Sequence, residues 1–224
     1  MAYTIEFVNA SGSSGKVYNV FSAKTAVEGG ANTPATVKSV VWYRSPTLSD
    51  GQREWFKFDN SFYGFLGSKR GTKIFTRENK AVTIASNMYN GSILLLDRES
   101  KFTVYEADDE ITLPDTGEFK IATNASLVSE NNVIGVSRGK EDDDGNIVPA
   151  PVTVVDLKPN VTYTFKTNKA VYIKATNFPE GTIQTGLDDS DKKAVKVEFA
   201  GQMKKAVVTE DSSGAFTVTY TRGG

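Results

Sequence analysis

The stretch TYTFKTNKAVYIKAT, residues 162–176, shows the pattern from which the fold class follows. On both sides of a central Thr-Asn-Lys, β-branched and aromatic residues alternate with polar ones, which is typical of strands rather than helices. The stretch therefore predicts one strand, a tight turn at residues 167–169 and a second strand.

The same alternation recurs along the chain. In REWFKF, residues 53–58, Glu54 shares one face with two phenylalanines while Trp55 lies on the other. Such runs return about every 8 to 12 residues between Gly, Asn, Asp and Ser clusters, and no dozen residues show helical apolar spacing. The sequence predicts an all-β protein built from antiparallel β-sandwich or partly open barrel units.

Composition and charge exclude several classes of protein. A chain of 224 residues with 39% hydrophobic content is long and apolar enough to form a core. Its formal net charge of -1 provides no overall attraction to nucleic acid or an anionic membrane. No apolar run approaches the roughly 20 residues of a membrane span, and no signal peptide is recognisable. We expect a soluble, cytoplasmic protein with no membrane partner.

The chain has no cysteine and no histidine. Thiolate nucleophiles, imidazole bases, Ser-His-Asp triads and structural zinc clusters therefore cannot be built from it. Phosphate loops and dinucleotide fingerprints are also absent from the sequence. We expect no cofactor, and any catalysis has to use carboxylates, phenols, amines or hydroxyls.

The tripeptide KAV suggests an internal duplication. Its copies at Lys80 and Lys193 are each followed by FTV, at Phe102 and Phe216, with offsets of 113 and 114 residues. Other weak matches keep the same order, which predicts two related β-domains, residues 1–110 and 111–224, packed tightly about a pseudo-two-fold axis. The alternative is one continuous sandwich or barrel to which both halves contribute strands.

Aromatic residues are concentrated in the first half, above all in residues 40–67. Five residues of this segment form the predicted ligand site, because two indoles can stack a flat or apolar ligand while a nearby arginine pairs with its anionic group: Trp42, Tyr43, Arg44, Arg53 and Trp55. The competing interpretation places the rings in the core with the arginines at its edge. The favoured function is a binding protein for a small molecule, aromatic or anionic, with its ligand pocket or interaction surface in the aromatic N-terminal half. A homo-oligomer is compatible with the sequence.

A cofactor-free enzyme of the cyclase, isomerase or lyase type is the alternative function. A carboxylate in an apolar pocket can act as an acid or base, because burial raises its pKa. The candidate catalytic residues are Glu54, Asp59 and Tyr63, which flank the tryptophans.

Two charged segments are interpreted as solvated turns and edges. In GKEDDDGNIVP, Asp142 and Asp144 have the spacing of an EF-hand loop, but Lys140 and Pro151 occupy ligand positions, so the sequence does not predict a metal site there. The basic run in residues 69–80 argues only weakly for nucleic acid.

Overall fold

The structure is a computed structural model that describes residues 2–29, 33–97, 101–108, 110–124, 131–184, 191 and 193–222. All regular structure within these ranges is strand, and they contain no helix, so none of them could cross a membrane as a helix. The all-β prediction is confirmed. The strands form three sheets of nine, six and four strands.

The nine-stranded sheet is the largest of the three sheets. Its order is β16-β5-β13-β12-β7-β1-β18-β19, with β8 pairing to β7 beside this path. All its pairs are antiparallel except β1 with β18. The strands are β16 (Ile183–Gln184), β5 (Lys38–Val40), β13 (Ile147–Asp156), β12 (Asn132–Glu141), β7 (Arg53–Arg70), β1 (Ala2–Asn9), β18 (Met203–Glu210), β19 (Phe216–Arg222) and β8 (Lys73–Val82).

The two smaller sheets pack through one core against this large sheet. The six-stranded sheet has the order β10-β9-β11-β14-β3-β4, and the four-stranded sheet has the order β17-β15-β2-β6. Their strands are β10 (Phe102–Tyr105), β9 (Ile93–Leu96), β11 (Glu118–Thr123), β14 (Thr162–Lys166), β3 (Ala26–Gly29), β4 (Thr33–Pro34), β17 (Ala194–Val197), β15 (Val171–Ala175), β2 (Tyr18–Ser22) and β6 (Tyr43–Arg44).

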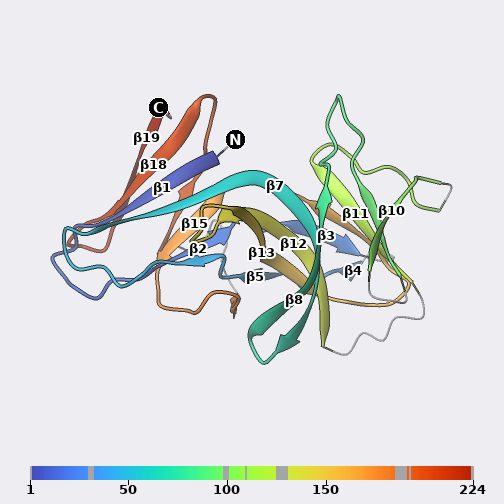
Figure 1. Cartoon of the computed structure of the whole chain (residues 1–224), viewed down its shortest axis with the longest axis horizontal. Helices are drawn as coiled ribbons and strands as arrows, with labels where there is room; N and C mark the ends of the chain where they lie inside the picture. The colour runs from blue at the N-terminus through green and yellow to red at the C-terminus, as the bar shows by residue number, and fades with distance from the viewer. Residues whose placement is uncertain are drawn as a thin grey trace.

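Strand β7 joins the two ends of the molecule. Figure 1 shows it arching from β1, β18 and β19 at one end towards β10 and β11 at the other. Its residues Phe56 and Phe58 pack against Trp42 near the first end. Further along, β7 approaches β9 so closely that a Cβ on Gly64 would lie 2.4 Å from Leu94 Cδ1. One buried cluster includes residues of all three sheets, so β7 contributes to a core that the sheets share.

Residues 162–176 form the two expected strands, β14 and β15, but the connection between these strands is not a hairpin turn. β14 pairs with β11 and β3 in the six-stranded sheet, whereas β15 pairs with β2 and β17 in the four-stranded sheet. Residues 167–170 therefore cross from one sheet to the other. Alternation predicts each strand, but it does not specify the partner, because partners are chosen by long-range packing.

The predicted duplication is not confirmed. Val82 lies in β8 beside β7, while its proposed equivalent, Val195, lies in β17 beside β15. The second pair differs as well, because Val104 lies in β10 next to β9 and Val218 in β19 next to β18. All three sheets contain strands from both sides of residue 110. The division into domains at residue 110 remains a prediction, and the sheets do not follow it.

Candidate functional site

A groove of about 740 Å³ lies beside the middle of β7. Strand β1 pairs with β7 as far as Asp59, and β8 begins to pair with β7 at Phe62. Asn60 and Ser61 lie between these two ladders and line the groove. The groove opens at the point where the strand that pairs with β7 changes from β1 to β8.

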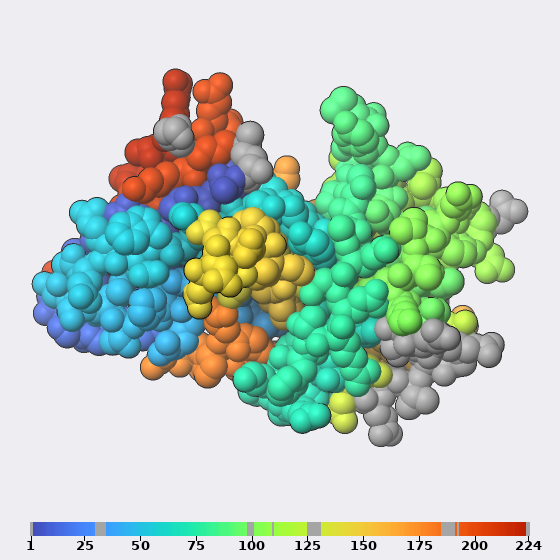
Figure 2. Space-filling view, in the orientation of Figure 1, coloured from blue at the N-terminus to red at the C-terminus, as the bar shows by residue number. Residues whose placement is uncertain are grey.

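Two strands of the large sheet and the segments that connect the other strands surround the groove. In Figure 2 the surface is hollowed between the β18–β19 hairpin and the green loop that follows β8. The lining consists of residues 60–63 of β7, 81 and 82 of β8, 84–86 after it, 116 and 117 before β11, the crossover residues 167–169, and Glu198 after β17.

The crossover that replaces the predicted turn is fixed against the opposite wall. Thr167 donates two hydrogen bonds to the carbonyl of Gly117, from its backbone nitrogen at 2.9 Å and from Oγ1 at 3.0 Å. The Asn168 side chain accepts a hydrogen bond from the Ala170 nitrogen at 3.0 Å. These bonds hold the groove-lining part of the crossover in place.

Uncharged groups dominate the chemistry of the groove. Serine, threonine and asparagine side chains alternate with Phe62, Tyr63, Val82 and Ile84, and the charged lining residues are Lys169 and Glu198. A volume of about 740 Å³ is within the range of small-molecule sites, which combine apolar walls with a few polar groups. The arrangement can hold a small organic molecule by apolar contact and hydrogen bonds.

A fully buried arginine lies behind the groove wall. The guanidinium carbon of Arg138 on β12 is 4.7 Å from the centre of the Trp42 ring and 5.3 Å from those of Phe58 and Phe62. Its Nη1 donates to Ser22 Oγ at 3.1 Å and its Nη2 to the Lys169 carbonyl at 3.3 Å. Phe62 and Lys169 belong to the groove as well as to the surroundings of Arg138.

The charge of Arg138 is poorly compensated. Burial lowers the pKa of its guanidinium to about 9, although the negative charge of Asp59 and the Tyr3 phenol act in the opposite direction. Among the residues described, no carboxylate lies within ion-pair distance of it. An arginine buried without a paired carboxylate is costly.

Comparison with known proteins identifies the family of this chain. A family model described as RhiA matches residues 1–221. The chain belongs to the RhiA family. No curated protein and no solved structure matches it. The site therefore has to be argued from its own geometry.

The two tryptophans have opposite environments. Trp42 is 1% exposed and lies in the core, in edge contact with Phe56 and Phe58. Trp55 is 50% exposed. Trp42 precedes β7 and packs against its inward-facing Phe56 and Phe58, so its ring does not lie on an open surface. Its role in ligand binding stays a prediction.

Tyr43, Glu54 and Trp55 meet at a smaller cavity of about 320 Å³. The Tyr43 hydroxyl donates to Glu54 Oε1 at 3.1 Å. Burial, and then the nearby Glu54 carboxylate, raise the pKa of Tyr43, so it stays protonated. Tyr43 and Trp55, predicted as ligand residues, thus lie beside Glu54, predicted as a catalytic acid, and acidic side chains adjoin them. Their functional roles stay predictions.

The two predicted arginines are held by other parts of the surface. Arg44 Nε donates to Asn177 Oδ1 at 2.9 Å. Arg53 forms an ion pair with the buried carboxylate of Glu6, which Lys205 also contacts. The role of either arginine in ligand binding stays a prediction.

The catalytic candidates are divided among three environments. Tyr63 lines the groove, and Glu54 lines the smaller cavity. Asp59 accepts hydrogen bonds from the Ser61 nitrogen at 2.9 Å and Ser61 Oγ at 2.7 Å. Asp59 therefore shapes the bend of β7 next to the groove. The structure does not bring the three residues into one site.

The acidic loop forms the turn between β12 and β13. Asp142 Oδ1 accepts hydrogen bonds from the nitrogens of Asp144 and Asn146 at 3.1 and 2.8 Å. Within the described ranges, no three acidic side chains are grouped so that they could hold a metal ion. Asp142 and Asp144 are bound into the loop as turn residues.

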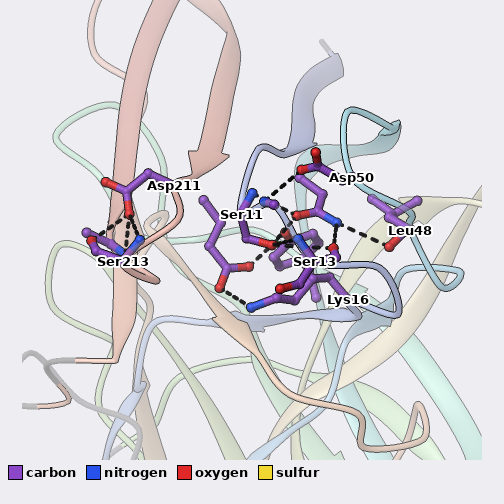
Figure 3. A network of polar contacts seen from close by, with 12 residues as sticks. Ser11, Ser13, Lys16, Leu48, Asp50, Asp211 and Ser213 are labelled. Atoms are coloured by element: carbon purple, nitrogen blue, oxygen red, sulfur yellow. Dashed lines mark hydrogen bonds and ion pairs between the residues drawn. The ribbon is translucent and has the colours of Figure 1, made fainter.

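A separate polar network fixes the loops where β1 and β18 end, as Figure 3 shows. The buried carboxylate of Glu210 accepts hydrogen bonds from Lys16 Nζ at 2.6 Å and the Tyr18 hydroxyl at 2.8 Å. Buried Asn9 donates to the carbonyls of Ser13 and Leu48. Burial raises the pKa of Tyr18, and the Glu210 carboxylate acts in the same direction. This network satisfies its own members and is structural.

Arg138 is the residue that sequence reasoning missed. In NVIGVSRGKE, it follows Ile134 and Val136 at a spacing of two, so it occupies an inward-facing position of a buried strand. A charged residue at such a position is the signal that could have identified it.

Proposed function

We propose that this protein binds a small organic molecule in the groove beside the middle of β7. The observation that carries the proposal is the gap between the β1 and β8 ladders, which exposes Asn60 and Ser61 next to apolar side chains. Gaps in a sheet are normally filled by side chains, and here the gap forms a cavity of ligand size.

The lining supports binding rather than catalysis. Its one carboxylate belongs to Glu198, which is exposed at the rim. The candidate acids Glu54 and Asp59 do not line the groove. Catalysis by a carboxylate with a raised pKa needs a buried acid directed at the ligand, so a cofactor-free enzyme is the weaker proposal. Most of the lining comes from β7, β8 and the loop after β8, in keeping with a ligand pocket in the aromatic N-terminal half. The expected cytoplasmic location belongs to this proposal, and cell fractionation tests it.

The test uses a dye that reports on apolar surroundings. N-phenyl-1-naphthylamine is neutral, and its fluorescence rises when it leaves water. We expect saturable binding to the wild-type protein. Ala81→Phe fills the groove from β8, where Ala81 is an exposed lining residue, and it should weaken binding about tenfold or more.

The matched control is Thr219→Phe, which adds the same ring at an exposed position of β19. It should leave dye affinity within about twofold of wild type. Absence of saturable binding, or equal affinity of the wild type and the Ala81→Phe variant, would refute the proposal.

A further inference from the structure

We propose that the ligand of the groove is an anion whose acidic group pairs with Arg138, an inference that rests on the proposed function. The ligand class is an apolar or hydroxylated body bearing one carboxylate, sulfonate or phosphate.

The first observation is the set of partners of Arg138. Its side chain is 0% exposed, yet the acceptors of its Nη atoms are neutral, the Ser22 hydroxyl and the Lys169 carbonyl. Its Nε is buried and has no acceptor among the described residues. Guanidinium groups form their strongest hydrogen bonds with oxyanions, often in pairs. A donor of this kind is therefore available for an anionic acceptor.

A second donor lies in the same place. The indole Nε1 of Trp42 is buried, and within the described part of the chain it also has no acceptor. The guanidinium of Arg138 lies over the Trp42 ring at 4.7 Å. Buried donors are almost always satisfied, so two such groups on neighbouring side chains point to an acceptor shared by this part of the core.

The groove reaches this position through one side chain. Phe62 is paired with Arg138 in the β7–β12 ladder, its ring lies 5.3 Å from the guanidinium, and it lines the groove. Lys169 also lines the groove, and its carbonyl already accepts from Arg138. A change of the Phe62 rotamer would open a path from the groove to Arg138, and such changes are common on binding.

The groups around Arg138 compensate its positive charge only in part. Asp59 on β7 is the acid that acts on it, but the Asp59 carboxylate is hydrogen-bonded to Ser61. Tyr3 on β1 contributes a phenol, and Ser22 on β2 a hydroxyl. An acidic group on the ligand would supply the counter-charge that these groups provide only in part.

The experiment compares two dyes that differ in one group. 8-Anilino-1-naphthalenesulfonate is N-phenyl-1-naphthylamine with an added sulfonate. We expect the wild-type protein to bind the sulfonate at least about tenfold more tightly, as for a charge-assisted hydrogen bond. Arg138→Met should remove this difference and leave the affinity for the neutral dye within about twofold. Arg138→Lys should retain part of the difference.

A readout on the wild-type protein covers the case in which the Arg138 variants fail to fold. The chain has two tryptophans, so its indole N–H groups give two NMR signals, which Trp55→Phe assigns. The sulfonate dye should shift the Trp42 signal, and the neutral dye should shift it much less.

The outcomes separate the two proposals. Equal affinity for both dyes, with Ala81→Phe weakening both, overturns the role of Arg138 and leaves groove binding intact. A preference for the sulfonate that survives Arg138→Met, or a Trp42 signal that both dyes shift equally, also overturns it. Failure of the neutral dye to bind, or binding of it that Ala81→Phe leaves unchanged, contradicts the proposed function itself. Binding of the neutral dye alone overturns only the role of Arg138.

Discussion

Trp42 and Trp55 show how the same residue type takes two roles within one aromatic segment. Trp42 is buried against Phe56, Phe58 and Arg138, while Trp55 lies half exposed on the opposite face of β7. Alternation predicts that neighbours in REWFKF face opposite ways. It does not say that Trp42, which precedes this strand, joins the inward group.

Trp42→Ala should reduce the free energy of unfolding by about 3 to 5 kcal/mol, because it removes a large buried ring and the face on which Arg138 stacks. Trp55→Ala should cost less than about 1 kcal/mol. Urea unfolding followed by circular dichroism measures both. Equal effects would contradict the assignment of Trp42 to the core.

Glu6 makes the stability of the fold depend on pH in the acidic range. The hydrogen bond from Lys205, with a further contribution from Arg53, lowers the pKa of this buried carboxyl below 4.5 against the opposing effect of burial. Since the folded value lies below the unfolded one, the charged form stabilises the fold above about pH 4.5, and this contribution is lost as pH falls through the folded value.

Glu6→Gln should therefore flatten the acid limb of the stability curve, by up to about 1.4 kcal/mol per pH unit. Urea unfolding from pH 7 to pH 3 tests this. As a control, Glu141→Gln breaks the exposed pair with Lys57 and should change stability at pH 7 by less than about 1 kcal/mol. An unchanged slope in Glu6→Gln would contradict the account.

Four of the residues predicted from the sequence line cavities, while their functional roles stay predictions. Tyr43, Glu54, Trp55 and Tyr63 all line cavities. The polar groove residues, such as Asn60 and Ser61, could not be chosen from sequence, because their exposure depends on where two neighbouring strands end.

At the scale of the element, β7 is defined by a bend. Its ladder with β12 is irregular between Arg138 and Lys140, and at this point Asp59 packs onto Gly139. A Cβ on Gly139 would lie 2.4 Å from Asp59 Oδ1 and 2.6 Å from Ile147 Cγ2. Glycine is required here for close approach.

Gly139→Ala should destabilise the fold by about 1 to 3 kcal/mol, as expected for overpacking, and should weaken dye binding because it displaces Asp59 next to the groove. Chemical denaturation and dye titration measure the two effects. Asp59→Ala in the same chain removes one of the two clashes and should restore part of the lost stability. Full stability in Gly139→Ala alone would contradict this packing.

The strands themselves were predictable from alternation, but their partners were not. β14 and β15 are adjacent in sequence and lie in different sheets, because each buries its apolar face against a different layer. Local pattern fixes which residues form strands. Sheet membership depends on contacts between residues far apart in the chain, which no local pattern contains.

On the scale of the whole molecule, β7 and one buried cluster connect all three sheets. β1 pairs with β18, and β7 pairs with β12, so strands of residues 1–110 depend on strands of residues 111–224. We expect unfolding to be a single cooperative transition.

A fragment of residues 1–110 should therefore fail to fold alone, since β1 and β7 would lose β18 and β12 as partners. Circular dichroism and amide-proton NMR dispersion of the fragment test this. A fragment that unfolds cooperatively with native-like dispersion would instead support the two predicted domains.

The central claim is that the groove beside the middle of β7 is the ligand site. The most direct measurement is a map of backbone amide NMR shifts during titration with N-phenyl-1-naphthylamine. The account predicts that the largest shifts occur at Ser61, Tyr63 and Asn168. Shifts centred instead on Trp55 and Asp143, or no saturable shifts at all, would contradict it.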